Sequence, residues 1–177
     1  MVWEVAVAED TAFESFVRGH TVVLMRTAFL LTGSKAAAEE LLQETLTRLY
    51  PQWLRVSSAD APVAYVRRAM TNGFVSQRRA PAARDVSVWE LPDGWDGADL
   101  AETVAARCTV WQLLATLPPR QRAAIVLRHF HDLPEREIAQ ALGCRPVTVR
   151  SLISRGLAAM RAQVDDTLAA NSVGRNG

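Results

Sequence analysis

The most constraining feature of this chain is a stretch of two helical patterns joined by a glycine, LPEREIAQALGCRPVTVRSLISRGLAAMR, at residues 133–161. Pro134 and Pro146 stand near the starts of the two patterns, where the missing backbone N–H of a proline costs nothing. Gly143 lies between them and supplies a turn. The apolar residues that recur at helical spacing are Leu133, Ile138, Ala141 and Leu142 in the first pattern and Val149, Ile153, Leu157 and Met160 in the second. The stretch therefore predicts two amphipathic helices around a tight turn.

The second of these helices is expected to turn a polar face toward solvent. That face carries Thr148, Arg150, Ser151, Ser154 and Arg155. An arginine can donate two hydrogen bonds to O6 and N7 of a guanine in the major groove, and serine and threonine suit phosphates or either kind of base. The alternative is an ordinary amphipathic hairpin with solvated arginines. The agreement of start, turn and stop signals favours a DNA-reading helix-turn-helix.

The charge distribution supports this interpretation. The net charge is only +1, but residues 107–163 carry nine basic and three acidic groups. Residues 1–80 carry nine and eight, and residues 81–106 carry one and six. Basic charge is thus concentrated where the helix-turn-helix lies, as binding to DNA phosphates requires.

The N-terminal part predicts a long helix. Thr11 and Glu14 form a capping box ahead of an apolar series, which places the helix from about residue 12 to Leu31, and Gly33 ends it. In the preceding residues, Trp3, Val5 and Val7 alternate as a strand would. That segment is short enough to pack on the first helix or fray instead.

Two more helices are predicted before residue 80. Ser34 caps one that Pro51 closes, and another begins near Pro62, after a loop at residues 51–62. The first has an apolar face of Leu41, Leu42, Thr45, Leu46 and Leu49 opposite Glu39, Glu40, Gln43 and Glu44. The second buries Val63, Val66, Met70 and Phe74 and shows Arg67, Arg68, Asn72, Arg78 and Arg79 to solvent.

Residues 81–99 predict an acidic, flexible linker, because they combine prolines, glycines and acids with no helical period. Trp89 and Trp95 are unusual there, and either pack on their own protein or dock on a partner. Helical patterns around residues 100–116 and after Pro118 and Pro119 lead into the helix-turn-helix. The predicted fold class is all-α, with two small helical domains and a tail, at residues 10–80, 100–164 and 165–177.

Several function classes find no support in the sequence. Cys108 and Cys144 lack the spacing of a zinc site or a disulfide framework, and His20, His129 and His131 lack nucleophile or ligand partners, so no enzyme, cofactor or metal is expected. No apolar run of eighteen residues exists, and the N-terminus lacks a basic region typical of a signal peptide. A cytoplasmic protein is expected, with no membrane insertion.

Two blocks of the sequence together resemble a known family. AEELLQETLTRLYPQW (38–53) with AYVRRAMTNGFVSQRR (64–79) resembles sigma region 2, and residues 114–161, from LATLPPRQRAAIVLRHF through the helix-turn-helix, resemble sigma region 4. The chain thus resembles the group IV, extracytoplasmic-function sigma factors of bacterial RNA polymerase, in the sigma-70 family. Its length leaves no room for regions 1.1 or 3, which is the group IV layout.

The resemblance implies roles for individual residues. Residues 51–62 would capture an extruded −10 base, and Ser76 departs from the acidic or amide residue common at its position. Pro134 stands where a serine cap is common, so Asp132 and Glu135 are expected to cap the helix instead. The implied contacts are Leu41, Leu42, Gln43, Glu44 and Leu46 with core polymerase; Arg67, Arg68, Asn72, Ser76, Arg78 and Arg79 with the −10 element during melting; Arg150, Ser151, Ser154 and Arg155 with −35 bases; and Arg145 and Thr148 with phosphates.

The function implied is that of a sigma factor, which directs core RNA polymerase to promoters and assists their melting, and which is a monomer when free. Core polymerase and promoter DNA are the expected partners, and an anti-sigma factor is a further candidate, because members of the family are commonly held by one. A free-standing helix-turn-helix repressor or activator is the main alternative, although it leaves the first block unexplained. A helical adaptor that binds only protein is another.

Overall fold

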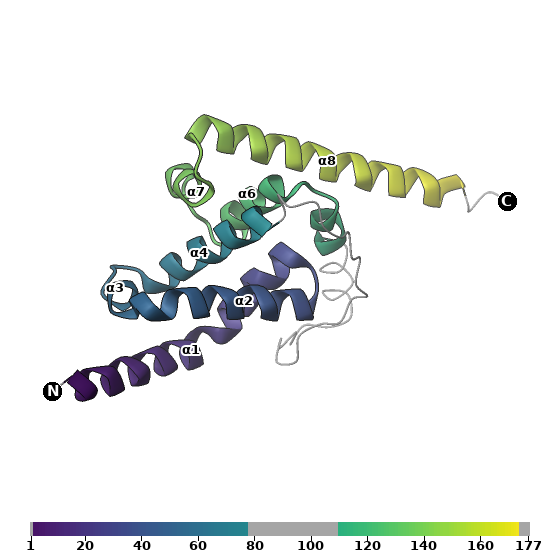
Figure 1. Cartoon of the computed structure of the whole chain (residues 1–177). Coiled ribbons are helices and arrows are strands. Elements are labelled where there is room, and N and C mark those ends of the chain that lie inside the picture. The colour runs from purple at the N-terminus through teal and green to yellow at the C-terminus, as the bar shows by residue number, and fades with distance from the viewer. Residues whose placement is uncertain (1, 78–109, 174–177) are drawn as a thin grey trace. The chain divides into compact units, whose positions relative to one another are not determined.

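The structure is a computed structural model, and it describes residues 2–77 and 110–173 (Figure 1). Side chains are described for residues 10–77 and 110–168. All regular elements in these ranges are helices, which confirms the predicted all-α fold class. The predicted linker, Cys108, Arg78 and Arg79 lie outside the described residues.

The helices belong to two compact units, Met1–Trp95 and Asp96–Gly177. The N-terminal unit contains α1 (Val2–Thr32), α2 (Lys35–Leu49), the 3-10 turn η1 (Tyr50–Gln52), α3 (Trp53–Ser57) and α4 (Pro62–Gln77). The C-terminal unit contains helical residues 110–115, α6 (Pro119–His129), α7 (Glu135–Leu142) and α8 (Pro146–Val173). Each unit has its own buried core.

The first helix is longer than the sequence pattern predicted. α1 begins at Val2 rather than near residue 12, so Thr11 and Glu14 lie inside it and the predicted capping box is wrong. The alternation of Trp3, Val5 and Val7 is likewise part of this helix. No glycine or proline precedes Gly19, and a backbone without such breaks can continue the helix toward its N-terminus.

The residues after α2 are folded rather than loop-like. The chain was predicted to form a loop at residues 51–62, but it makes η1 and α3 before a short connection to α4. Trp53 and Val56 are buried, at 3% and 1% exposure, and this burial holds the segment in place. Pro51 ends α2 as predicted, yet its fixed φ is compatible with the tighter 3-10 turn that follows.

An aromatic cluster joins this segment to α1. The ring of Phe13 meets those of Tyr50 and Trp53 edge to face, at centroid distances of 5.0 and 5.1 Å. The ring centroids of Phe16 and Trp53 lie 4.8 Å apart, and the Tyr50 hydroxyl donates a hydrogen bond to the Asp10 carboxylate. Aromatic pairs at these distances contribute more to folding stability than the burial of their surface alone would give. The cluster therefore fixes η1 and α3 against α1.

The remaining core of the N-terminal unit follows the predicted faces closely. Ser34 caps α2 as predicted, since its hydroxyl accepts a hydrogen bond from the Ala37 N–H at 3.2 Å. Two predicted core residues, Leu46 and Val63, are only partly buried. The face of α2 that packs on α4 and α1 consists of Ala38, Leu41, Leu42, Thr45 and Leu49, and α4 contributes Val66, Met70 and Phe74.

Two arginines of α6 organise the C-terminal unit. Arg122 is 4% exposed, and its Nη2 donates to the backbone oxygens of Ala115 at 2.5 Å and Leu117 at 3.4 Å. These carbonyls precede Pro118 and Pro119, whose nitrogens carry no proton to donate. Arg120 Nη2 donates to the Leu142 oxygen at the end of α7, at 2.8 Å. Both side chains thus satisfy carbonyls that helix ends leave open.

The turn between α7 and α8 has the geometry that the sequence predicted. Gly143 caps α7 in the left-handed region, at φ 58° and ψ 47°, and the Cys144 N–H donates to the Ala139 oxygen at 3.0 Å. This arrangement is a common helix stop that favours glycine. α8 then runs without interruption to Val173, so its last turns occupy part of the predicted tail at residues 165–177.

Replacing Gly143 tests this turn. Gly143→Ala is expected to destabilise the C-terminal unit by about 1 kcal/mol, because a Cβ is strained in the left-handed region. Gly19→Ala makes the same change inside α1, where a Cβ would meet no heavy atom of the described residues within 4 Å, and should stabilise by up to about 1 kcal/mol. Urea unfolding followed by circular dichroism measures both. An unchanged unfolding midpoint for Gly143→Ala would contradict the assigned turn.

Candidate nucleic-acid interface

The first turns of α8 present a polar strip to solvent. One side of the helix is buried in the C-terminal unit, where Val149 is 0% and Leu152 is 7% exposed. The other side carries the residues predicted to meet the −35 element. Of these, Arg145, Arg150, Ser151, Ser154 and Arg155 are exposed, and Thr148 is half-buried. We call this set of six residues the α8 strip.

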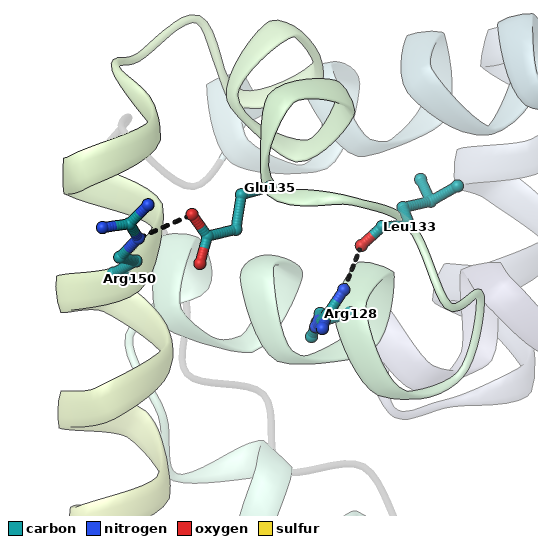
Figure 2. Close-up of polar contacts among 4 residues, drawn as sticks. All are labelled: Arg128, Leu133, Glu135 and Arg150. Carbon is teal, nitrogen blue, oxygen red and sulfur yellow. Dashed lines mark hydrogen bonds and ion pairs between the residues drawn. The ribbon is translucent and has the colours of Figure 1, made fainter.

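Arg150 is held by an ion pair within the helix-turn-helix. Its Nε lies 2.7 Å from Oε2 of Glu135, in the first turn of α7 (Figure 2). The side chain of Arg150 is 71% exposed and that of Glu135 is 34% exposed. The hydrogen bond uses the Nε–H of Arg150, and the terminal nitrogens Nη1 and Nη2 lie further along the side chain. Glu135 was expected only as a capping residue, so the sequence pattern missed this partner.

The start of α7 corrects the predicted cap. Pro134 occupies the N-cap position and forms no side-chain cap hydrogen bond, so the predicted capping pair of Asp132 and Glu135 is wrong. Asp132 instead adopts a positive φ of 50° in the connection from α6. In that connection, Arg128 Nη1 donates to the Leu133 oxygen at 3.1 Å (Figure 2). Glu135 is therefore available to Arg150.

Arg155 is placed differently from Arg150. Its Nε donates to the backbone oxygen of Ser151, one turn earlier in α8, at 3.2 Å. This contact draws the guanidinium along the helix surface. Arg150 and Arg155 therefore have different orientations, which their residue type alone did not predict.

Val147 is an apolar neighbour of the α8 strip that the sequence pattern missed. It is 64% exposed in the first turn of α8. Its spacing from Arg150 and Ser151 puts all three on one face of the helix. That spacing could have identified it, whereas polarity could not, because Val147 is apolar. The methyl group of thymine is an apolar feature of the major groove that such a side chain can contact.

The predicted −10 residues of α4 do not all share one environment. Arg68, Asn72 and Ser76 are exposed and follow one another at intervals of four, so they lie on one face. Arg67 is half-buried, and its buried Nε has no hydrogen-bond partner among the described residues. Burial lowers the pKa of the Arg67 guanidinium from its ordinary value, because desolvation disfavours the charged form.

A hollow lies between α2, α3 and α4 beside these residues. Its volume is about 280 Å³, and it is open to solvent. Its lining consists of Leu49, Arg55, Tyr65, Arg68, Ala69 and Asn72. Arg68 and Asn72 were predicted for the −10 element, and Arg55 belongs to the segment predicted to capture a base. Tyr65 was missed, because a single tyrosine in a helical pattern carries no signal of its own.

The predicted polymerase-binding residues of α2 divide into two groups. Gln43 and Glu44 are exposed, and the Glu44 carboxylate accepts a hydrogen bond from the Gln77 side chain of α4. Leu41 and Leu42 are 2% and 5% exposed and lie in the core of their own unit. Leu46 is partly exposed. Helical spacing gives an apolar face, but it does not tell a core from a binding surface.

The described residues contain neither a candidate metal site nor a helix that could span a membrane. Residues 2–77 and 110–173 contain no group of three or more histidine, cysteine, aspartate or glutamate side chains placed to hold a metal ion. No helix in those same ranges is long and apolar enough to cross a membrane.

Known proteins resemble the chain over nearly its whole length. The family described as Sigma-70, region 4 matches residues 109–160. The RNA polymerase sigma-E factor of Streptomyces avermitilis is 34% identical over 157 residues, which cover 89% of this chain and 87% of the relative. The ECF RNA polymerase sigma factor SigJ of Mycobacterium tuberculosis is 36% identical over 170 residues, with 88% of this chain and 51% of the relative covered.

A solved structure has the same fold. It is that of the sigma factor RpoE from Bartonella quintana in complex with the anti-sigma factor NepR. The TM-score is 0.64 at 22% identity, and the match covers 87% of this chain and 97% of that chain. With both units matched in sequence and the helical fold matched in structure, the chain belongs to the extracytoplasmic-function family of RNA polymerase sigma factors.

Proposed function

We propose that this protein directs bacterial core RNA polymerase to specific promoters and assists their melting, while the polymerase carries out the chemistry. The observation that most supports this function is the 34% identity to an RNA polymerase sigma-E factor over 89% of the chain. A free-standing repressor or activator needs only a helix-turn-helix. The similarity extends across the N-terminal unit as well, which favours a sigma factor over that alternative.

In this proposal the α8 strip enters the major groove at the −35 element. Arg150, Ser151, Ser154 and Arg155 face the bases, and Val147 meets a thymine methyl group. Arg145 and Thr148 lie at the start of α8, where the helix dipole favours phosphate. The exposed fractions of these side chains support the proposal, because base readout needs side chains that reach out of the protein surface.

The N-terminal unit would hold the melted −10 strand. The hollow beside α4 offers a tyrosine ring for stacking and two polar side chains, Arg68 and Asn72, for an extruded base. Arg67 is half-buried beside them, and its positive charge would attract the phosphates of the strand. Arg78 and Arg79, outside the described residues, would add basic charge along the same backbone.

A sigma factor needs protein partners, and these determine where it acts in the cell. Gln43 and Glu44 would contact core polymerase from the exposed face of α2. The related fold of RpoE is recorded in complex with an anti-sigma factor, which makes such a factor a candidate partner here. A protein with these partners acts in the cytoplasm, and it is expected to be a monomer when free and to have no catalytic activity of its own.

Binding to DNA with and without polymerase tests the proposed function. The free protein should bind duplex promoter DNA weakly, because each unit presents only a small recognition surface. Core polymerase should bring specific binding and permanganate-reactive thymines near −10, since both units then act at high effective concentration. A tight footprint over a two-fold site with the protein alone, unaltered by polymerase, would favour the repressor instead.

The role of Arg150 can be tested by base substitution in promoters. Arg150→Ala should weaken use of the preferred −35 sequence by about 1–3 kcal/mol, roughly 5- to 150-fold, at one base position. Arg161→Ala is a matched control, because Arg161 is an exposed arginine of the same helix about three turns further on. Transcription with core polymerase from promoters varied at each −35 position measures both. Equal base preferences in Arg150→Ala and wild type would contradict the assignment.

Tyr65 provides the corresponding test in the hollow. Tyr65→Ala should reduce promoter opening, because stacking of a base on an aromatic ring contributes about 1–3 kcal/mol. Tyr65→Phe keeps the ring and should open promoters almost as wild type does. Permanganate reactivity of −10 thymines in the polymerase complex measures opening. If alanine and phenylalanine opened the promoter equally well, Tyr65 would have no stacking role.

A further inference from the structure

The contact between Glu135 and Arg150 links the two helices of the helix-turn-helix. We propose that Glu135 is a positioning residue that sets base specificity at the −35 element, by holding the Arg150 guanidinium in the orientation that reads a guanine. This inference rests on the proposed function. Glu135 itself would touch no base.

The geometry of the guanidinium makes this arrangement possible. An arginine presents five N–H groups in a fixed planar fork. Glu135 accepts from Nε at 2.7 Å, on the side of the fork nearest the helix backbone. The terminal nitrogens, Nη1 and Nη2, form a separate edge that can donate to O6 and N7 of a guanine. The carboxylate and the base can therefore be bound at the same time.

Exposure indicates that this ion pair has little to do with the stability of the fold. Arg150 is 71% exposed, and ion pairs this close to water contribute little to folding. Its effect is to restrict a long and flexible side chain. When the side chain is ordered before DNA binds, less conformational entropy is lost on binding to the correct base. With the guanidinium held in one orientation, its N–H groups do not align with the acceptors of a different base.

The charge of Glu135 has an effect of its own. A carboxylate in a surface that faces DNA repels phosphates, so it lowers the affinity for every sequence. Its favourable effect is confined to promoters where Arg150 finds its base. A residue that weakens binding to all DNA but supports one specific contact increases the difference in affinity between the preferred promoter and other sequences.

Glu137 offers a matched comparison. It lies in the same first turn of α7 and carries the same charge, but it is exposed two residues away. Two residues correspond to a rotation of about 200° around the helix axis, which turns its side chain to another face. Glu135→Ala and Glu137→Ala therefore remove equal charge from the same helix turn. Only the first should release Arg150.

The test measures base preference with the full chain and core polymerase. Binding and transcription are compared on promoters that carry each of the four bases at each −35 position. Glu135→Ala should lower the preference by about fivefold or more at the position that Arg150→Ala affects. Glu137→Ala should bind all promoters equally or more tightly with unchanged preference. Glu135→Gln keeps an uncharged acceptor of the same length and should restore part of the preference.

Two further measurements separate positioning from other roles. The double variant Glu135→Ala with Arg150→Ala should have the base preference of Arg150→Ala alone, because the carboxylate then has nothing to orient. Glu135→Ala should also steepen the dependence of binding on salt, or leave it unchanged, since a repulsive charge is gone. Circular dichroism of each variant shows whether the helices are retained, and Glu135→Gln carries the test if the alanine variant unfolds.

The outcomes distinguish this inference from the function on which it rests. If Arg150→Ala loses preference at one base and Glu135→Ala retains it in full, the positioning role is overturned and the sigma function stands. If neither variant changes any preference, Arg150 reads no base, and both the reading role and the positioning role fail. If the wild-type chain directs polymerase to no promoter, the proposed function itself is overturned.

Discussion

Burial of one side of α8 determines what the C-terminal unit can present to a partner. Val149 and Leu152 are enclosed by the core, and the same helix rotation that buries them places the α8 strip in solvent. Close approach of α6 and α8 is part of this constraint, since a Cβ at Gly156 would come within 2.6 Å of the Ile125 side chain. The orientation of the proposed reading face is thus fixed by packing on the opposite side.

Local signals predicted much of this fold, and long-range contacts account for the rest. Gly143 forms a turn and Ser34 forms a cap through contacts with residues only a few positions away in the chain. Both could therefore be predicted from the sequence. The folding of residues 50–57 depends on Trp53 meeting two phenylalanines from α1, far away in the chain. The sequence pattern missed the helix before residue 12 because a capping box usually marks a helix start, although nothing upstream of this one breaks the helix.

Residue type alone also does not predict the different environments of the arginines. Arg122 is buried and serves backbone carbonyls, Arg150 pairs with a carboxylate in solvent, and Arg67 lies between these extremes. Each environment arises from side chains that other elements contribute, such as Glu135 from α7. Periodicity could place these residues on helices and on faces. It could not say which of them remain available to DNA.

The length of α8 has a mechanical consequence. The helix contains 28 residues, about 42 Å, and the α8 strip occupies only its first turns. Residues 165–168 are exposed, so this far end is accessible to other molecules. The Gln163 side chain of α8 donates a hydrogen bond to the Thr116 hydroxyl, so the helix contacts its own unit well beyond the reading turns. A continuous helix bends only gently, so a partner that binds residues 165–168 can transmit force along α8 toward those turns.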